Sequence, residues 1–466
     1  MALSKTPPHM KNKLSLAIFR DKDRFWELVR TITQNNFGRH VLGSYALQIG
    51  SVLLSMFSSI LLARLLGADG FGEYAYALNW ALLLTTFTTL GMDKLAVRSI
   101  ASYAAKEQWS FIKGFMRWTS IMVLLFSLLI MAIAFAVRGY FVAEFTPSIF
   151  FTLTISLFLL PLLALTRVYQ GILRGFHLIL KGQVAETILR PLLLIFFLLL
   201  GYFTIRQMTA SLAMGLHVTA AISGLAIIVY LVICIVKPRT RNLQPAYTRR
   251  LWLTIAIPIL LSSMLDEINQ RASILMLGTL LNTEAVGVYN VAKRLAEPTI
   301  FVLIAINVTL APRIANYYSN NQHEEMQSLV TRSTRAALLL SGLTVLFIIS
   351  LGPRLFLLWG PEFSAGYPVL IILALGQLAQ AAIGPVVILL NMTGYERNVV
   401  VGLAISSTLN ILLNIVLIPR YGMMGAASAT VAGILSWNIL LAGRVRKLLR
   451  IDPSILGRTI GASHNG

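Results

Sequence analysis

The fold of this chain is decided by residues 250–312, which read RLWLTIAIPILLSSMLDEINQRASILMLGTLLNTEAVGVYNVAKRLAEPTIFVLIAINVTLAP. Its two apolar runs, residues 250–281 and 285–312, are each long enough to cross the roughly 30 Å hydrocarbon core of a membrane. Beyond Arg250 at the start of the first run, they nevertheless contain six charged residues, which are Asp266, Glu267, Arg271, Lys293, Arg294 and Glu297. A charge at mid-bilayer costs from about 2.5 to more than 10 kcal/mol, so such residues face a partner or a water-filled cavity. The stretch therefore predicts a helical hairpin that handles something polar inside a membrane.

Composition places the whole chain with polytopic membrane proteins, because 57% of its 466 residues are apolar, 12% are charged and the mean hydropathy is +0.75. A net charge of +21 would suggest nucleic acid in a soluble protein. Here the basic residues lie between the apolar runs, so no nucleic-acid partner is expected. The single cysteine, Cys234, excludes disulfides and a thiolate metal site. No P-loop, GxGxxG or HExxH pattern occurs, and we expect no cofactor and no metal.

Apolar segments long enough to span a membrane recur along the chain. The twelve expected spans are residues 41–66, 74–97, 114–137, 147–173, 184–203, 209–236, 250–281, 285–312, 333–358, 364–392, 398–418 and 423–445. The connections on one side hold 30 of the 39 Lys and Arg residues, and those on the other side hold 4. By the positive-inside rule, both termini are therefore expected in the cytoplasm.

The longest polar break between spans divides this all-helical chain into two lobes of six spans each. The expected parts are a basic cytoplasmic segment (residues 1–40), the first lobe (41–236), a cytoplasmic linker (237–249), the second lobe (250–448) and a cytoplasmic tail (449–466). The basic segment is either a helix on the membrane surface or an unstructured tail.

An internal repeat relates the two lobes at an offset of 215 residues and pairs Gly72 with Gly287 and Tyr74 with Tyr289. Because each lobe has an even number of spans, the lobes share one orientation. Two parallel lobes around a central cavity are an architecture typical of alternating access.

The repeat also relates the charged hairpin to a polar face of the first span. That face consists of Ser44, Gln48, Ser51, Ser55 and Ser58, which follow helical steps of four and three residues. At the same offset Ser51, Ser55 and Ser58 correspond to Asp266, Gln270 and Ser273, and Asn79 corresponds to Arg294. A polar stripe in lipid either packs tightly on a neighbouring helix or lines water. The matching faces favour a shared lumen.

A purely structural role for the hairpin stays open, because Glu267 and Arg271 are spaced i,i+4, as are Lys293 and Glu297. Such pairs neutralise each other on one helix. Buried ion pairs are seldom the most stable choice, however, and apolar residues would serve a structural helix better. Arg64 is a weaker candidate, since its long side chain can instead reach the outer interface.

The run LLARLLGADGFGEY at residues 61–74 resembles the N-terminal signature of the polysaccharide-biosynthesis (Wzx-type) flippases, as do Gly91-Met92-Asp93 and Val97-Arg98. These flippases belong to the multidrug/oligosaccharidyl-lipid/polysaccharide exporter superfamily, and the likeness covers about residues 40–450. It implies a bacterial inner-membrane transporter, not an enzyme. Its substrate would be undecaprenyl-diphosphate-linked oligosaccharide, moved from the cytoplasmic to the periplasmic leaflet for O-antigen, capsule or exopolysaccharide assembly. Expected partners are this substrate, membrane lipids, a polysaccharide polymerase and a chain-length regulator.

By position, the resemblance makes Arg271, Lys293 and Arg294 the cations that face the diphosphate. This agrees with their chemistry, since a guanidinium presents a planar fork to phosphate oxygens and an ammonium acts as a point charge. The further expected substrate-binding residues are Asn290, Gln270, Gln48, Ser51, Ser55, Asn79 and Arg64. Residues expected to couple an ion are Asp266, Glu267 and Glu297.

Two other functions compete with the flippase. A drug or small-molecule antiporter of the same superfamily would need a cavity dominated by carboxylates, whereas the hairpin holds three acids and three bases. A membrane-bound O-antigen polymerase or ligase would be expected to carry a large catalytic outer loop. No expected outer loop exceeds about a dozen residues, which argues against the enzyme.

Overall fold

The computed structural model describes residues 36–141, 146–204 and 207–457, and in these ranges the chain forms helices and no strands. The first half contains α2 (Asn36–Thr89), α3 (Met92–Ala105), α4 (Trp109–Phe141), α5 (Pro147–Ser156), α6 (Leu159–Gly175), α7 (Ile179–Val184), the π-helical turn η1 (Ala185–Leu189), α8 (Arg190–Thr204) and α9 (Ala210–Thr240). The second half contains α10 (Arg249–Leu280), α11 (Thr283–Ala296), α12 (Pro298–Ser319), α13 (His323–Phe356), the short 3₁₀ helix η2 (Pro361–Gly366), α14 (Tyr367–Ile383), α15 (Val386–Met392) and α16 (Glu396–Leu449).

Two of these helices, α2 and α16, are each 54 residues long. At 1.5 Å per residue each would extend about 81 Å, far more than one crossing of a 30 Å hydrocarbon core requires. Each is interrupted by one glycine with a positive φ, Gly67 at 69° and Gly422 at 55°. Glycine adopts this conformation without a Cβ penalty, so the chain bends where the sequence predicts the boundary between two spans.

Ten helices among the described residues are long and apolar enough to cross a membrane. Two of the ten are α2 and α16, each of which covers two of the expected spans. The count of twelve crossings and the pseudo-symmetry of the lobes stay predictions. The expected surface segment at residues 1–40 falls almost wholly outside the described residues, as does the end of the expected tail, residues 458–466.

The expected span at residues 285–312 is two helices, because α11 ends at Ala296 and α12 begins at Pro298. Proline lacks a backbone N–H and is best tolerated at the start of a helix, so it marks the break. A second break divides the expected span at residues 364–392, where Gly384 has a φ of 95° between α14 and α15.

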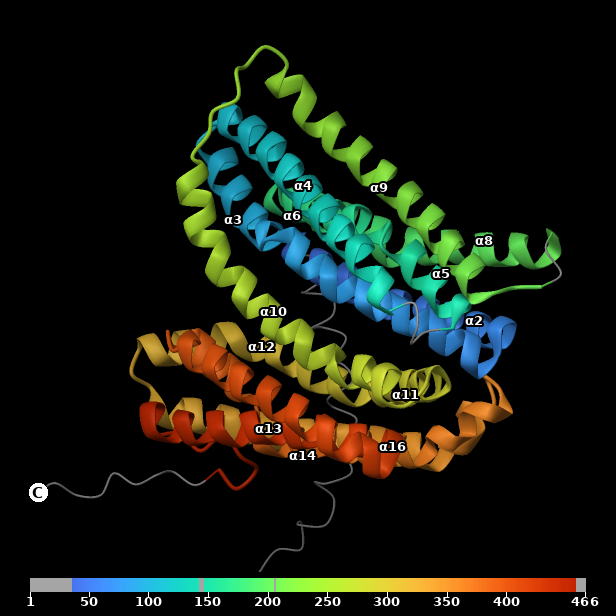
Figure 1. Ribbon diagram of the computed structural model, residues 1–466. Coiled ribbons are helices and arrows are strands. Elements are labelled where there is room, and N and C mark those ends of the chain that lie inside the picture. The colour runs from blue at the N-terminus through green and yellow to red at the C-terminus, as the bar shows by residue number, and fades with distance from the viewer. Residues whose placement is uncertain (1–35, 142–145, 205–206, 458–466) are drawn as a thin grey trace, which may run out of the picture.

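The two halves of the chain lie on opposite sides of the molecule (Figure 1). Helices α3 to α9 form one group, α11 to α16 form the other, and α10 runs between them. The long helix α2 packs against both α10 and α11. The largest buried apolar cluster also joins the halves, since it includes Tyr76 and Ala77 of α2 together with Val291 and Leu295 of α11.

The halves are in direct contact at one end, which we call the closed end. Arg64 Nε of α2 donates to the carbonyl oxygen of Leu358 at 2.9 Å, and its Nη2 donates to that of Leu357. Trp359 Nε1 donates to Ser59 Oγ at 3.0 Å, and Thr283 Oγ1 donates to Asp69.

Backbones meet at the closed end as well. A Cβ added at Gly72 would overlap the Thr283 carbonyl group, and one added at Gly287 would lie 3.1 Å from the nitrogen of Gly72. The paired glycines that reveal the internal repeat thus lie at a close backbone contact between α2 and α11.

The residues after α16 fold back over the second half. Gln327 of α13 donates through Nε2 to the carbonyl oxygen of Asp452 at 2.8 Å, and the Asp452 N–H donates to Gln327 Oε1 at 2.8 Å. Arg446 Nη2 lies 2.9 Å from Asp452 Oδ1. Burial alone would raise the pKa of Asp452, but hydrogen bonds from Arg446 and Ser454 outweigh it and hold the pKa below its ordinary value of 3.8.

Candidate functional site

A cavity of about 230 Å³, which we call the central cavity, lies between the two halves next to the closed end. Its polar lining comes from four helices and consists of Ser55, Ser58, Ser59 and Tyr74 of α2, Arg190 of α8, His217 of α9, and Asn290 and Arg294 of α11. The described residues that line it include two arginines and no carboxylate.

Arg294 joins the hairpin to the polar face of the first span. Its Nη1 donates to the carbonyl oxygen of Ser55 and lies 3.3 Å from Ser55 Oγ. The neighbouring wall contains a hydrogen bond of 2.6 Å between Tyr74 Oη and His217 Nδ1, both buried. The contact between Ser55 and Arg294 places the polar stripe of α2 against the charged face of α11.

A second cavity, of about 340 Å³, lies further along α2, and we call it the inner cavity. Leu78 and Leu82 of α2 line the central cavity, and Thr86 and Thr89, on the following turns, line the inner cavity. The cavities are thus stacked along α2. The charged residues of the inner lining are Asp93, Lys94, Arg167, Arg174, Glu186, Asp266 and Glu267.

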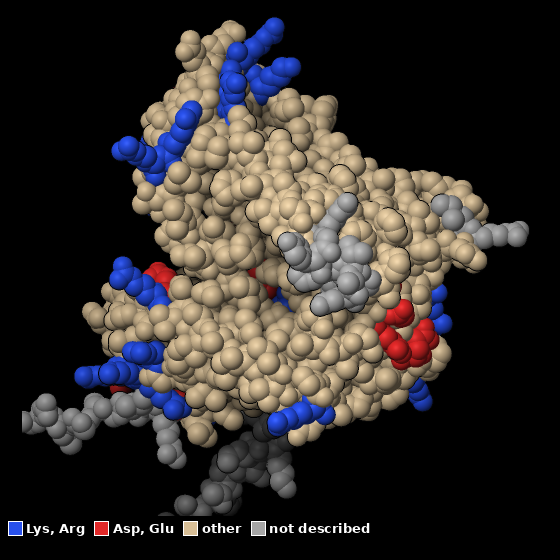
Figure 2. Space-filling model, in the orientation of Figure 1, with Lys and Arg blue, Asp and Glu red and all other residues tan. Residues whose placement is uncertain are grey.

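The inner cavity lies toward the end of the molecule that carries the basic connections of the chain. Figure 2 shows Lys and Arg gathered over the ends of both halves on the left of the view, with charged atoms visible in the hollow between them. Lys94 Nζ donates to Ser263 Oγ of α10 at 2.8 Å, and Arg167 Nη1 donates to Thr86 Oγ1 at 3.0 Å. This lining mixes both signs of charge, unlike that of the central cavity.

The charged face of α10 adjoins the inner cavity, whose lining includes Asp266 and Glu267. Arg271 Nε lies 2.5 Å from Glu267 Oε1, and its Nη1 donates to Asn79 Oδ1 of α2 at 2.7 Å. Gln270 Nε2 donates to Asp266 Oδ2 at 3.1 Å. The i,i+4 pair of Glu267 and Arg271 therefore forms, and Asn79 extends it across the two halves.

The second i,i+4 pair of the hairpin does not form an ion pair in the described structure. Lys293 Nζ instead donates to the carbonyl oxygen of Gln270 at 2.5 Å, because α11 packs against α10. Glu297 is exposed at the break before Pro298. Helical spacing alone thus gave the right partner for Arg271 and missed that of Lys293.

The sequence-predicted site residues fall into four places. Ser55, Asn290 and Arg294 line the central cavity, and Asp266 and Glu267 line the inner cavity. The hydrogen bonds of Asn79, Gln270, Arg271 and Lys293 hold α2, α10 and α11 together. Arg64 lies at the closed end. Ser51 is half-buried on α2 outside both linings, and the side chain of Gln48 lies outside the described residues.

The repeat predicted a lumenal face for Ser58 and Ser273 alike, and the structure separates them. Ser58 lines the central cavity, whereas Ser273 is buried in the second half. Ser273 Oγ lies 2.7 Å from Thr430 Oγ1 and accepts a hydrogen bond of 3.0 Å from Asn414 Nδ2.

Sequence reasoning missed Arg190, which is one of the 30 basic residues counted in the connections on the cytoplasmic side although it stands inside the expected span at residues 184–203. It lies within the candidate span Gly182–Thr204 and lines the central cavity. Arg167 and Lys94, which line the inner cavity, were also not among the predicted site residues. Arg167 could have been found, since it stands inside an expected span, as the hairpin charges do.

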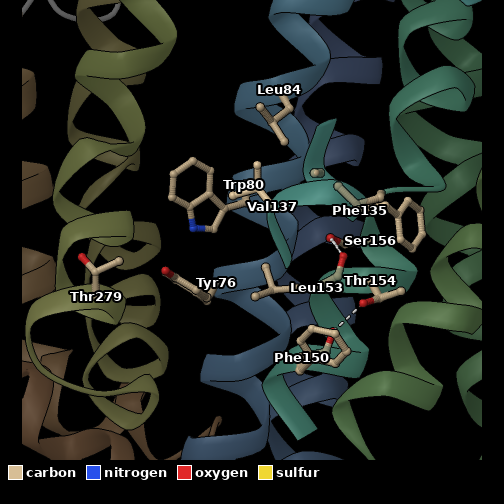
Figure 3. A pocket seen from close by; sticks show the side chains of 12 residues that line it. Tyr76, Trp80, Leu84, Phe135, Val137, Phe150, Leu153, Thr154, Ser156 and Thr279 are labelled. Carbon is tan, nitrogen blue, oxygen red and sulfur yellow. Dashed lines mark hydrogen bonds between the residues drawn. The ribbon is translucent and has the colours of Figure 1, made fainter. Parts of the chain in front are cut away.

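An apolar cavity of about 270 Å³ lies on the other side of α2, between α2, α4, α5 and α10. Figure 3 shows Tyr76 and Trp80 of α2 on one wall and Leu153 and Phe150 of α5 on another, with Thr279 of α10 opposite. Its lining contains no charged side chain among the described residues. The charged side chains that line cavities are those of the central and inner cavities.

Two family models match the chain. One, described as "Polysaccharide biosynthesis protein", matches residues 37–318, and the other, described as "MatE", matches residues 258–416.

Curated relatives include two proteins of Haloferax volcanii, "Probable low-salt glycan biosynthesis flippase Agl15" at 30% identity and "Probable flippase AglR" at 26%. The matches cover 33% of this chain and 33% of the first relative, and 39% of each for the second. The chain thus spans about a third of the first protein and about two fifths of the second. "Stage V sporulation protein B" of Bacillus subtilis is 22% identical, with 86% of this chain and 82% of that protein covered.

Solved structures share the fold. An inward-facing multidrug resistance MATE family transporter of the MOP superfamily superposes with a TM-score of 0.73 at 15% identity, covering 86% of this chain and 95% of the other. "Lipid II flippase MurJ, inward closed conformation" superposes with a TM-score of 0.69 at 14% identity, covering 87% of each chain.

Proposed function

Because the chain belongs to the family described as polysaccharide biosynthesis proteins, we propose that it is a flippase for lipid-linked oligosaccharides, a transporter and not an enzyme. It is a multi-pass membrane protein of the MOP superfamily. In the proposed function it moves undecaprenyl-diphosphate-linked repeat units from the cytoplasmic to the periplasmic leaflet of a bacterial inner membrane, for O-antigen, capsule or exopolysaccharide assembly. Both termini lie in the cytoplasm, and a polymerase and a chain-length regulator use the product.

One observation supports this proposal: polar cavities lie between two halves that are joined by hydrogen bonds and close backbone contacts at the closed end. The closed end is joined by hydrogen bonds between α2 and the chain after α13, while the inner cavity lies toward the basic end. Alternating access requires such a barrier on one side of a polar site, and a rocking motion that moves the barrier to the other side.

The proposed substrate matches the chemistry of these cavities. The diphosphate needs cations, and Arg271, Lys293 and Arg294 stand between the halves. The sugars need hydroxyl and amide partners, supplied in the proposal by Asn290, Gln270, Gln48, Ser51, Ser55 and Asn79, with Arg64 at the closed end. An inside-negative potential favours outward movement of the anionic head by about 2.3 kcal/mol per charge per 100 mV. Asp266, Glu267 and Glu297 are the proposed residues for coupling to an ion.

The function is tested by deleting the gene and locating the lipid-linked oligosaccharide. We expect it to accumulate on the cytoplasmic leaflet while its synthesis continues. Normal surface polysaccharide in a deletion strain without a redundant flippase would exclude the proposed function.

The site is tested by complementation of that strain with Arg271→Gln, Lys293→Gln and Arg294→Gln, each compared at equal protein level. Each variant should fail to restore surface polysaccharide. The exposed Arg420 of α16 lies outside both cavities, so Arg420→Gln is the matched control and should complement. Full activity of all three hairpin variants would leave the hairpin a structural role only.

A drug antiporter is the second candidate function, because the described lining of the inner cavity holds four carboxylates beside three bases, which would suit a cationic substrate. The MatE family match over residues 258–416 points the same way. Uptake of cationic dyes into inverted vesicles separates the two functions. Dye transport driven by an ion gradient, without accumulation of lipid-linked sugar in the deletion strain, would support the antiporter.

A further inference from the structure

The cavity of about 270 Å³ between α2, α4, α5 and α10, which we call the apolar cavity, lies among membrane-spanning helices (Figure 3). The described residues that line it belong to four candidate spans, Gly50–Thr89, Trp109–Val137, Pro147–Gly175 and Arg249–Leu280. An apolar cavity of roughly 150 Å³ stays dry and binds benzene. The apolar cavity is larger, so it suits a hydrocarbon ligand better than water.

The serine and threonine hydroxyl groups of this lining are hydrogen-bonded to the helices that carry them. Each donates to a backbone carbonyl oxygen of its own helix, Thr154 at 2.8 Å, Ser156 at 2.7 Å and Thr279 at 3.2 Å. Two of these bonds are visible in Figure 3. The three hydroxyl groups therefore direct no hydrogen toward a ligand, and the cavity selects for apolar groups.

The apolar cavity and the central cavity lie on opposite faces of α2. Tyr76 and Trp80 line the apolar cavity, whereas Tyr74 and Leu78, each two positions earlier, line the central cavity. Residues two positions apart on an α-helix point about 200° apart around its axis. A single helix therefore separates the polar site between the halves from an apolar site beside it.

Tyr76 also closes the seam between α2 and α10. A Cβ added at Gly278 of α10 would overlap the ring of Tyr76, so this ring packs directly on the α10 backbone. The next residue, Thr279, lines the apolar cavity. One wall of the cavity thus belongs to the second half of the chain, and the other walls belong to α2, α4 and α5 of the first half. Separation of α2 from α10 would join the apolar cavity to the space between the halves.

The apolar cavity also reaches the surface that faces lipid. Val137 of α4 lines it and is 40% exposed, and Thr279 lines it and is exposed as well. Ile133, one turn before Val137 on α4, is also exposed. A long hydrocarbon chain can therefore lie partly in the cavity and partly in the membrane.

We infer that the apolar cavity binds a section of the polyprenyl chain of the substrate, and that this chain passes into the membrane at the seam between α2 and α10. The inference rests on the proposed function and deepens it, because it places the lipid part of the substrate. The head group in the central cavity and the chain in the apolar cavity lie on the two sides of α2. When the halves separate, head and chain leave through one continuous gap, and the chain never crosses a polar lining.

The chemistry of the lining favours this chain over that of a phospholipid. Both are hydrocarbon, and the membrane itself is as apolar as the cavity, so contacts with the walls decide between them. The described lining holds no charged side chain that would fix a phospholipid head group. The chain of the substrate is instead held nearby, because its head group binds on the other side of the same helix.

Photo-crosslinking of the full-length protein in lipid nanodiscs tests the site. The photoreactive residue p-benzoylphenylalanine replaces Val137 at the rim of the cavity, and Ala136, exposed on the same helix but outside the lining, is the matched control position. A second pair replaces Thr279, with the exposed Leu280 as its control. The nanodiscs contain phosphatidylcholine with undecaprenyl phosphate as a minor component, and mass spectrometry identifies the lipid in each adduct.

We expect polyprenyl adducts at Val137 and Thr279 to exceed those at their controls about tenfold, a factor that corresponds to about 1.4 kcal/mol. Filling the cavity with Ala134→Trp should abolish this excess. Ala132→Trp should not, because Ala132 is exposed on the same helix and lies outside the lining. Gel filtration and circular dichroism check that each variant is folded.

The outcomes separate the site from its ligand and from the function. Equal polyprenyl adducts at the rim and control positions would overturn the inference, as would an excess that persists in folded Ala134→Trp. Rim adducts with phosphatidylcholine in proportion to its share of the membrane would also overturn it, since the cavity would then take any lipid. Flipping in reconstituted vesicles is measured separately on the unlabelled protein. Specific polyprenyl adducts without flipping would leave the site standing and exclude the proposed function, and flipping without them would do the reverse.

Discussion

The contact between Gly72 and Thr283 predicts that a single methyl group opens the closed end. In Gly72→Ala the new Cβ would overlap the Thr283 carbonyl group and lie 3.1 Å from the backbone nitrogen of Gly287. Both neighbours are backbone atoms of α11, so neither can rotate away as a side chain would. The strain is relieved only by separating α2 from α11.

The size of the effect follows from the cost of overpacking, which is typically about 1–3 kcal/mol. The overlap exists only in the state in which α2 and α11 are in contact. The overpacking energy therefore destabilises this state and not the open one. A difference of about 1–3 kcal/mol corresponds to a factor of about 5–150 in the ratio of open to closed molecules. Alanine also has a better helix propensity than glycine, but that gain is common to both states.

The assay measures access to the central cavity from the side of the closed end. Ser58, which is 7% exposed and lines the cavity, is replaced by cysteine in a Cys234→Ser background, since Cys234 is exposed. A membrane-impermeant maleimide should then label Ser58→Cys about 5–150 times faster when Gly72→Ala is added. Gly215→Ala is the matched control, because a Cβ at Gly215 of α9 meets nothing within 4 Å. Equal labelling rates in Gly72→Ala and Gly215→Ala would refute the reasoning.

Two further predictions concern the same contacts and the chain after α16. Replacing Asp69 and Thr283 with cysteines in the Cys234→Ser background should allow a disulfide across the closed end, since the native side chains are hydrogen-bonded. Oxidation should stop transport and reduction restore it, whereas transport at full rate by the oxidised protein would show that the closed end need not open. Asp452→Asn should lower the thermal stability at pH 7, because a carboxyl with a depressed pKa contributes stability above its unfolded pKa. The difference in thermal stability between Asp452→Asn and the wild type should shrink as the pH falls below 3.8. A difference that is constant with pH would contradict the dependence of stability on the Asp452 charge.

Several features of the molecule could be predicted because they depend on local sequence. Apolar length predicts helices that cross a membrane, and the positive φ of Gly67 and Gly422 interrupts the two long helices near the expected boundaries. The i,i+4 spacing of Glu267 and Arg271 predicts their ion pair, since helical geometry alone brings them together. The paired glycines at 72 and 287 also marked a real contact.

What the sequence by itself determined, then, is the class of the molecule, its family resemblance, and the stretch that carries charge into the membrane. The tertiary structure alone decided which of those charged side chains are free to contact a substrate and which are held by other parts of the protein. Lys293 is held by the Gln270 carbonyl, and Arg64 by carbonyls almost 300 residues away. Arg190, which the charge count placed among the connections, lines the central cavity together with Arg294 because α8 and α11 both pack against α2. Helical periodicity fixes neighbours on one helix, but the neighbours across a cavity depend on how separate helices pack.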